Sequence, residues 1–258
     1  MHTRIKTRPI RDSITMSGRS MKIALRNGEA LIQATITPIF LMLLFGAVFG
    51  NIVDVGGYSY VAFIIPGIIL QAIGQASQYT AINVSTDMTK GIIDRFRSMP
   101  ISKSAFLVGH AGASIVRNAF TAAIILITAF AIGFRPEAGF LDWLLIIGVL
   151  LLVVAAITWI AVLCGILAKS PESSSGLMFP LFIIPFISSG FAPTETLHGS
   201  IRWFAERQPM TPIINTLRSL MLGRGMGDDF WLAVIWCIGI LLVAYIVAVQ
   251  IYKRKMTK

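Results

Sequence analysis

Charged residues are scarce in this 258-residue sequence: only 13% are Asp, Glu, Lys or Arg, whereas 55% are hydrophobic. Because a soluble domain normally carries about a quarter charged residues, this composition excludes an ordinary water-soluble protein. Long apolar runs meet the length of roughly 20 residues that is needed to span hydrocarbon. They cover residues 30–50, 60–84, 106–134, 141–168 and 231–252. The sequence therefore predicts an all-α integral membrane protein.

Motifs for several kinds of chemistry are also missing. The sequence has no G-x-x-x-x-G-K-[ST] motif and so no phosphate-cradling P-loop, and it has neither H-E-x-x-H nor G-x-S-x-G. His2, His110 and His198 lie far apart in the chain. We therefore expect no metal site, no catalytic residue and no cofactor bound by this chain. Cys164 and Cys237 lie in separate apolar runs, which favours packing over disulfide formation.

Acidic residues are few, and the twelve present fall in expected loops or at the edges of the apolar runs. An ion-driven secondary transporter or channel normally needs carboxylates near the centre of the membrane. That class of protein remains an alternative, but this distribution counts against it. A purely structural scaffold is disfavoured by the prolines and polar stripes inside the expected spans.

Basic residues are concentrated in alternate loops and give the chain a net charge of +10. They are frequent before the first apolar run, in the loop at 85–104 and in the tail at 253–258. On the other side of the membrane, the last loop carries basic and acidic residues in balance. The positive-inside rule then places both termini in the cytoplasm. The same charge attracts anionic lipid, and this distribution disfavours nucleic-acid binding. The first 30 residues contain no apolar core of a cleavable signal peptide.

Six spans are expected, at residues 31–51, 58–82, 106–133, 141–168, 175–192 and 231–251. A basic cytoplasmic arm at 1–19 precedes a transmembrane domain at 20–252. Within that domain, residues 20–30 have the periodicity of a helix lying in the cytoplasmic interface, or equally of the wet end of the first span. Prolines inside spans predict bends; they are Pro38, Pro66, Pro180 and Pro185.

The segment at 193–224, which begins near Glu195, predicts two short half-buried helices on the outer side. The first places Trp203 at the level of the lipid headgroups. For the second, Thr211 is a candidate N-cap, Pro212 suits the first helical position and Gly223 can end the helix. One apolar stripe lies between these signals; it consists of Ile213, Ile214, Leu217, Leu220 and Met221.

A short amphipathic helix is predicted inside the loop at 85–104. Its polar face carries charges of both signs at helical spacing, namely Asp87, Lys90, Asp94 and Arg97. Its opposite face carries Phe96 among apolar residues, and Pro100 ends it. Two interpretations are open. The apolar side can rest on lipid, or it can fill a groove on a cytosolic partner.

The order of residues in three blocks resembles that of a known family. The blocks are KGIIDRFRSMPISKSAFLVGH, LAKSPESSSG and SSGFAPTETLHGSIRWFAERQPMTPIINTLRSLMLG. They are similar to the cytoplasmic loop, the loop before span five and the outer segment of type-2 ABC exporter permeases of the daunorubicin-resistance type, which export drugs or lipids. The resemblance extends over residues 20–252.

This resemblance implies a half-transporter without an ATPase domain of its own. It would pair with a second permease subunit, identical or related, and with separate P-loop ATP-binding subunits that carry ATP and Mg²⁺. The helix in the loop at 85–104 would be the coupling helix that docks on the ATPase. Its expected contact residues are Lys90, Asp94, Arg95, Phe96 and Arg97.

Two polar stripes inside spans are candidates for a substrate path. Gln71, Gln75 and Gln78 follow helical spacing in span two, and a shorter stripe in span three includes Ser114, Arg117 and Asn118. Polar side chains in hydrocarbon usually face protein or a cavity. Hydrogen bonding between helices is the other interpretation of the glutamines, and Arg117 can also extend toward the cytoplasmic surface.

The resemblance implies a membrane subunit of an ATP-driven exporter in the bacterial plasma membrane. The expected cargo is a hydrophobic or amphipathic drug or lipid. Export of a lipid-linked polysaccharide is the alternative within the family.

Overall fold

The computed structural model describes residues 28–89, apart from positions 51, 54, 56 and 58, and residues 105–257. All regular structure in this part of the chain is helical, which confirms the all-α prediction for it. The long helices are α2 (Gly28–Phe49), α3 (Tyr60–Thr89), α5 (Ala105–Ala131), α6 (Phe140–Leu167) and α10 (Phe230–Thr257). The short elements are α7 (Pro171–Ile183), the 3₁₀ helices η1 (Ile184–Ile187) and η2 (Thr194–Thr196), α8 (Gly199–Arg207) and α9 (Met210–Met221).

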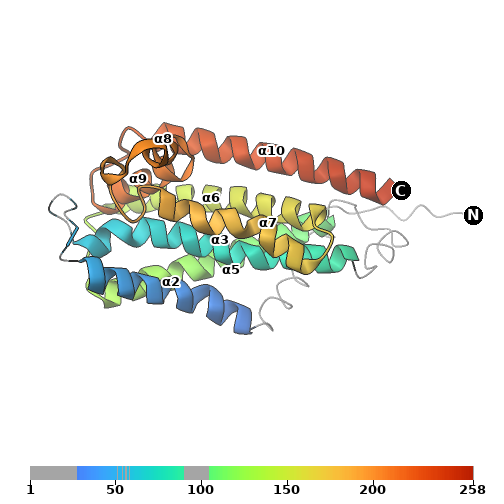
Figure 1. The fold of residues 1–258 in the computed structure, drawn as a ribbon, viewed down its shortest axis with the longest axis horizontal. Coiled ribbons are helices and arrows are strands. Elements are labelled where there is room, and N and C mark those ends of the chain that lie inside the picture. The colour runs from blue at the N-terminus through green and yellow to red at the C-terminus, as the bar shows by residue number, and fades with distance from the viewer. Residues whose placement is uncertain are drawn as a thin grey trace, which may run out of the picture.

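The long helices run side by side, and α8 and α9 gather at one end of the bundle (Figure 1). We call this the α9 end, and we call the opposite end, where α3 and α10 finish, the Thr89 end. Helix α3 is the central element, because it contacts α2, α5, α6, α7 and α9. The most apolar 18-residue stretch of this helix is 89% buried. Helix α10 packs mainly on α6 and α9.

Glycines allow backbones to approach α3 closely. A Cβ atom on Gly67 would lie 2.7 Å from the carbonyl oxygen of Gly190, and one on Gly74 would lie 2.9 Å from a carbonyl oxygen of α7. On the α6 side, a Cβ atom on Gly165 would lie 2.7 Å from the carbonyl oxygen of Ala81. Small residues at such contacts are typical of packed helices in membranes.

Four described helices are long and apolar enough to cross a membrane, namely α3, α5 from Phe106, α6, and α10 as far as Lys255. The apolar stretch of α2, Thr35–Phe49, is shorter. The fifth span expected at 175–192 corresponds to α7 followed by η1, and helical structure in this segment ends at Ile187, before the expected boundary. Pro185 lies inside η1 and has no amide hydrogen to continue an α-helical ladder.

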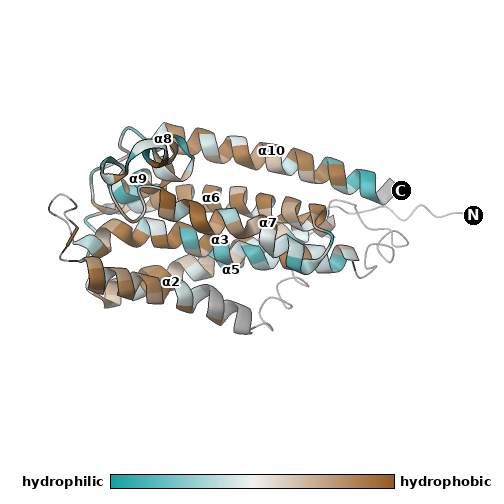
Figure 2. Ribbon diagram, in the orientation of Figure 1, coloured by the Kyte–Doolittle hydropathy of each residue, from teal (hydrophilic) through white to brown (hydrophobic). Residues whose placement is uncertain are grey.

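Two other boundaries differ from expectation. The loop predicted at 85–104 begins later, because α3 continues to Thr89, and the tail predicted from residue 253 is helical as far as Thr257. The ammonium group of Lys255 donates to the carbonyl oxygen of Ile166 at 2.6 Å, which ties the end of α10 to the end of α6. Figure 2 shows α10 hydrophobic along most of its length and hydrophilic near this end.

The start of α9 was also predicted wrongly. The helix begins at Met210 with Pro209 as its N-cap, so Thr211 and Pro212 lie inside its first turn. The hydroxyl of Thr211 does not cap α9 and instead donates to the carbonyl oxygen of Ala205 in α8. The predicted end is confirmed, because Gly223 follows the helix with a φ of 67°.

The arm at 1–19, most of the interfacial segment predicted at 20–30, and residues 90–104 lie outside the described residues. Residues 28–30 belong to α2.

Candidate functional site

Polar side chains gather where α3 and α5 meet, in an otherwise apolar bundle. We call this group the α3–α5 polar cluster, although it includes one residue of α6. All its members are buried; they are Ser77, Thr80 and Asp87 of α3, His110, Ser114, Arg117 and Asn118 of α5, and Thr158 of α6. The predicted stripe of Ser114, Arg117 and Asn118 is thus brought together with partners from two other helices.

Ser114 is the centre of the hydrogen bonds in this cluster. The hydroxyl of Thr80 donates to Ser114 Oγ at 2.8 Å, and the hydroxyls of Ser114 and Thr158 lie 3.0 Å apart. The amide nitrogen of Asn118 donates to Ser77 Oγ at 3.0 Å. These bonds connect α3, α5 and α6 within the bundle.

Arg117 is only 6% exposed, so its side chain lies inside the protein. Its Nη2 donates to Thr80 Oγ1, but its Nε has no hydrogen-bond partner among the described residues. The described side chains also supply no salt bridge to it. A buried cation with so few acceptors is costly.

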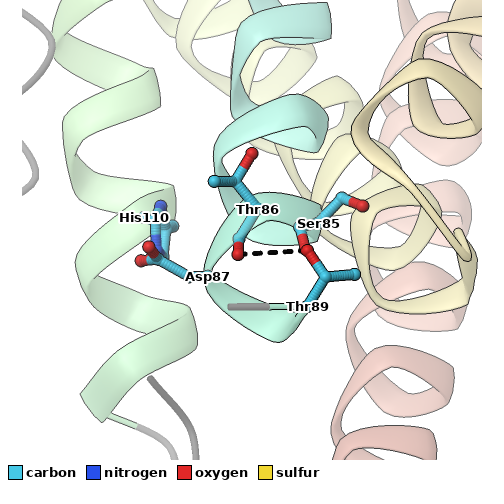
Figure 3. Close-up of polar contacts among 5 residues, drawn as sticks. All are labelled: Ser85, Thr86, Asp87, Thr89 and His110. Carbon is cyan, nitrogen blue, oxygen red and sulfur yellow. Dashed lines mark hydrogen bonds and ion pairs between the residues drawn. The ribbon is translucent and has the colours of Figure 1, made fainter. Parts of the chain in front are cut away.

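Asp87 and His110 meet between α3 and α5 near the Thr89 end (Figure 3). His110 Nε2 lies 3.1 Å from Asp87 Oδ2, and the ring of Phe106 packs edge-on at 4.8 Å between centroids. In the last turn of α3, the hydroxyl of Thr89 donates to the carbonyl oxygen of Ser85 at 2.9 Å. Among the described residues, no group of three His, Cys, Asp or Glu side chains could hold a metal ion.

A cavity of about 120 Å³ is lined by Arg117 and by both residues of this pair. Its lining comes from the last turns of α3 and the first turns of α5, and consists of Thr80, Asn83, Thr86, Asp87, His110, Ala113 and Arg117. Asn83 and Thr86 are half-buried, so the cavity reaches the protein surface. Its size and polar walls suit water molecules or one small polar group.

The glutamine stripe of α3 faces protein rather than lipid. Gln71 is fully buried, and neither atom of its amide has a hydrogen-bond partner among the described residues. The carbonyl oxygen of the Gln75 side chain also has no hydrogen-bond partner among the described residues. Gln78 is half-buried. The bonds between helices that would make Gln71 a structural residue are therefore not seen.

Buried polar atoms without a partner concentrate on α3 and α5. Within the described chain, only Thr216 of α9 has such an atom outside these two helices. The residues concerned on α3 and α5 are Gln71, Gln75, Ser85, Arg117, Asn118 and Thr121. Because protein interiors rarely leave such atoms unpaired, these two helices have spare capacity for hydrogen bonds.

The three candidates in the outer segment occupy different elements. Glu195 is exposed in η2, and Trp203 of α8 is 60% exposed with the Arg207 guanidinium 5.1 Å from its ring centroid. Pro212 is buried in α9. These positions do not form one pocket.

Arg218 of α9 is a second arginine turned into the bundle, and no pattern in the sequence indicates its role. Its Nε donates to the carbonyl oxygen of Phe63 at 3.1 Å, its Nη1 to Asn215 Oδ1 at 3.0 Å, and its Nη2 to the carbonyl oxygen of Ser189. The guanidinium also lies 3.7 Å from the centroid of the Phe63 ring. Burial lowers the pKa of Arg218 to about 9, so the side chain remains a cation at neutral pH.

The predicted ATPase contacts all fall outside the described residues, so they stay predictions. They are Lys90, Asp94, Arg95, Phe96 and Arg97.

Sequence reasoning missed the α3 side of the polar cluster. It assigned Asp87 to the helix in the loop at 85–104, whereas this residue lies in α3 and contacts His110. Thr80, Asn83 and Asp87 recur at spacings of three and four residues, which is a helical polar face. The expected end of the second span at residue 82 excludes Asn83 and Asp87 from this face. His110 was set aside because no other histidine is near it in the chain, whereas its partner is a carboxylate on another helix.

Comparisons with known proteins agree with the family resemblance. A family model described as "ABC-2 type transporter" matches residues 12–222. The daunorubicin resistance ABC transporter permease protein DrrB1 of Streptomyces coeruleorubidus is 29% identical over 87% of this chain and 80% of its own length. The probable doxorubicin resistance ABC transporter permease protein DrrC of Mycobacterium tuberculosis is 26% identical over 98% of this chain and 87% of its own. The inner membrane transport permease YadH of Escherichia coli is 26% identical over 59% of this chain and 60% of its own.

Proposed function

Because the chain belongs to the ABC-2 type transporter family, we propose that it is the permease subunit of an ATP-driven exporter of hydrophobic or amphipathic drugs or lipids. It is a multi-pass membrane protein, with four described helices able to cross a bilayer. The family match is the observation that carries the proposal. The drug-resistance names of two relatives support this class of cargo.

The proposed topology has six spans in a bacterial plasma membrane, with both termini in the cytoplasm. In this arrangement α2 and the α7–η1 pair supply the first and fifth spans beside the four longer helices. The basic residues Arg254 and Lys255 in the last turn of α10 support a cytoplasmic Thr89 end. The α9 end then faces outward.

ATP hydrolysis is assigned to separate P-loop subunits, which would hold ATP and Mg²⁺ and dock on the loop that follows α3. The sequence contains no P-loop of its own. A second permease subunit, identical or related, completes the transporter. The large exposed apolar side chains on α10, among them Trp231, Ile235 and Val243, suit contact with lipid or with that subunit.

The proposed substrate path follows the polar faces of α3 and α5, because the unpartnered polar atoms concentrate on these two helices. Cargo or water would supply the missing hydrogen bonds. The path includes Gln71, Gln75 and Gln78, which lie on the side of α3 that carries Gly67 and Gly74, and it includes Ser114, Arg117 and Asn118 of the α3–α5 polar cluster.

Phe96→Ala tests the coupling role. Burying a phenylalanine in a partner's cleft stabilises docking by about 2–3 kcal/mol, so the variant should bind the ATPase roughly 30- to 150-fold more weakly. The matched control is Phe140→Ala, because Phe140 is 85% exposed at the start of α6, at the α9 end. The measurements are pull-down of the ATPase and substrate-stimulated ATP hydrolysis in reconstituted membranes. If Phe96→Ala docks and stimulates like the parent protein, the coupling assignment is wrong.

Replacing Gln71, Gln75 and Gln78 together by leucine tests the path. Leucine has a similar size and keeps the helix, but it removes the amides that would meet cargo. We expect the variant to insert and bind its ATPase normally while its preference among transported drugs changes. Failure to assemble would make the stripe structural, and an unchanged export profile would exclude it from the path.

A further inference from the structure

We propose that the cavity between α3 and α5 binds the anionic, phosphate-bearing head of an amphiphile, with Arg117 as its cation. This inference depends on the proposed function in one respect only, because it takes the bound amphiphile to be a molecule that the protein transports. Its chemical basis is the arginine itself. Arg117 is only 6% exposed and lines the cavity. Its Nε has no hydrogen-bond partner among the described residues. An oxyanion accepts from two guanidinium nitrogens at once, which a hydroxyl such as Thr80 does not do.

The hydroxyl and amide groups around the guanidinium suit the same ligand. Asn83 and Thr86 line the cavity together with Arg117, and both carry groups that donate to phosphate oxygens. The cavity volume of about 120 Å³ admits one phosphate group but not the body of a drug or an acyl chain. The apolar part of the amphiphile would therefore remain outside, along the surface of the bundle.

The apolar surface needed for that part lies next to Arg117 on α5. Val116 is 50% exposed and Phe120 is 54% exposed. An acyl chain that follows these side chains would stay in the hydrocarbon while its head enters the cavity.

The level of the cavity in the membrane favours a lipid-like head. Thr80 lies twenty residues after Tyr60, the first residue of α3. At 1.5 Å per residue this separation is about 30 Å, which matches the thickness of the hydrocarbon core. With the start of α3 at one interface, Thr80 and Arg117 lie near the headgroup level of the opposite leaflet.

Asp87 lines the same cavity, and the presence of an acidic side chain in a site for an anion needs an explanation. It lies seven residues beyond Thr80 on α3, which is about 10 Å along the helix axis. Its carboxylate is also in contact with His110 at 3.1 Å. The two ends of the cavity are thus chemically distinct, and the anion belongs at the end with Arg117.

The test uses the purified full-length protein in detergent, without ATP or the ATPase. Dioctanoyl phosphatidylglycerol, dioctanoyl phosphatidylcholine and inorganic phosphate are titrated separately while thermal unfolding is followed. We expect saturable stabilisation by the phosphatidylglycerol. Arg117→Gln should weaken its binding roughly tenfold or more, because a charge-assisted bond is lost. Arg117→Lys keeps the charge but loses the contact through two nitrogens, so its affinity should lie between those of the parent protein and Arg117→Gln. Arg135→Gln, which replaces an exposed arginine beyond the other end of α5, should retain all of the affinity.

Competition distinguishes the two sources of phosphate. If inorganic phosphate displaces the lipid at comparable concentrations, the site recognises phosphate alone; if it does not, the site recognises a lipid head. Either result supports the anion site. Equal stabilisation by phosphatidylcholine, or unchanged binding by Arg117→Gln, would overturn it.

A second measurement covers the possibility that Arg117→Gln does not fold. A phosphatidylglycerol analogue with a photoreactive headgroup should label residues 80–87 and 110–117 of the parent protein, and labelling elsewhere would also overturn the proposal. Since no step involves ATP, these results are independent of the docking experiment with Phe96→Ala. A protein that binds the lipid but no ATPase would refute only the proposed function.

Discussion

Two arginines reach toward α3 from opposite halves of the bundle, and their surroundings differ. Each of the three guanidinium nitrogens of Arg218 donates to an oxygen atom, and the Phe63 ring covers its face. Arg117 donates to Thr80 and leaves its Nε unpartnered among the described residues. The same side chain is therefore satisfied by its own protein in one place and not in the other.

This difference separates a structural role from a binding role. The bonds of Arg218 join α9 to the backbone of α3 and to the turn after η1, so they hold the α9 end together. Tyr60 strengthens the same end by donating to the carbonyl oxygen of Phe191 at 2.8 Å. A cation whose bonds are incomplete, as at Arg117, is instead prepared to accept a ligand.

The largest effect is expected for Arg218→Met. The substitution keeps an unbranched side chain but leaves three acceptor oxygens without their charged donor. Because hydrogen bonds to charged groups contribute about 1.5–3 kcal/mol each and Arg218 is only half-buried, we expect a loss of about 2–4 kcal/mol. Thermal unfolding of the protein in detergent measures this loss.

Arg202→Gln is the matched control for that experiment. Arg202 forms an exposed ion pair with Glu206 at 2.7 Å in α8, and such pairs contribute at most about 1 kcal/mol. Equal stability of Arg218→Met and Arg202→Gln would show that Arg218 does not hold the α9 end.

A smaller effect is expected for Gly67→Ala, one turn after Phe63. Its new Cβ would lie 2.7 Å from the oxygen and 2.8 Å from the Cα of Gly190, and these backbone atoms have no rotamer by which to move away. Overpacking of this kind costs about 1–3 kcal/mol. Gly148→Ala in α6 is the control, because a Cβ there meets nothing within 4 Å and alanine favours a helix. If both variants unfold alike, the α9 end is not closely packed around Gly67.

The sequence predicted best what depends on neighbours in the chain. All five residues of the apolar stripe in α9 are buried, because a repeat near 3.6 residues identifies the face of a helix wherever that helix packs; they are Ile213, Ile214, Leu217, Leu220 and Met221. Ser114 and Asn118, which the sequence places on one polar stripe of the third span, are both buried in α5.

Contacts between distant residues could not be predicted in the same way. The bond between Arg218 and the carbonyl oxygen of Phe63 joins positions 155 residues apart, and no local pattern specifies the pairing. The start of α9 failed for a related reason, since Thr211 bonds to α8 instead of capping its own helix. His110 likewise needed the register of α3 against α5 to find Asp87.

The smallest change in stability is expected for Arg117→Met. The substitution removes one hydrogen bond to Thr80, which would destabilise the fold, but it also removes a buried cation whose bonds are incomplete, which would stabilise it. Replacing buried charges by apolar side chains of similar volume is often neutral or stabilising. We therefore expect a change below about 1 kcal/mol in lipid-free detergent, measured beside Arg218→Met under the same conditions. A loss as large as that of Arg218→Met would mean that Arg117 is satisfied within the fold, and the distinction between the two arginines would fail. A small change, accompanied by loss of stabilisation by phosphatidylglycerol, is the result that only a binding role predicts.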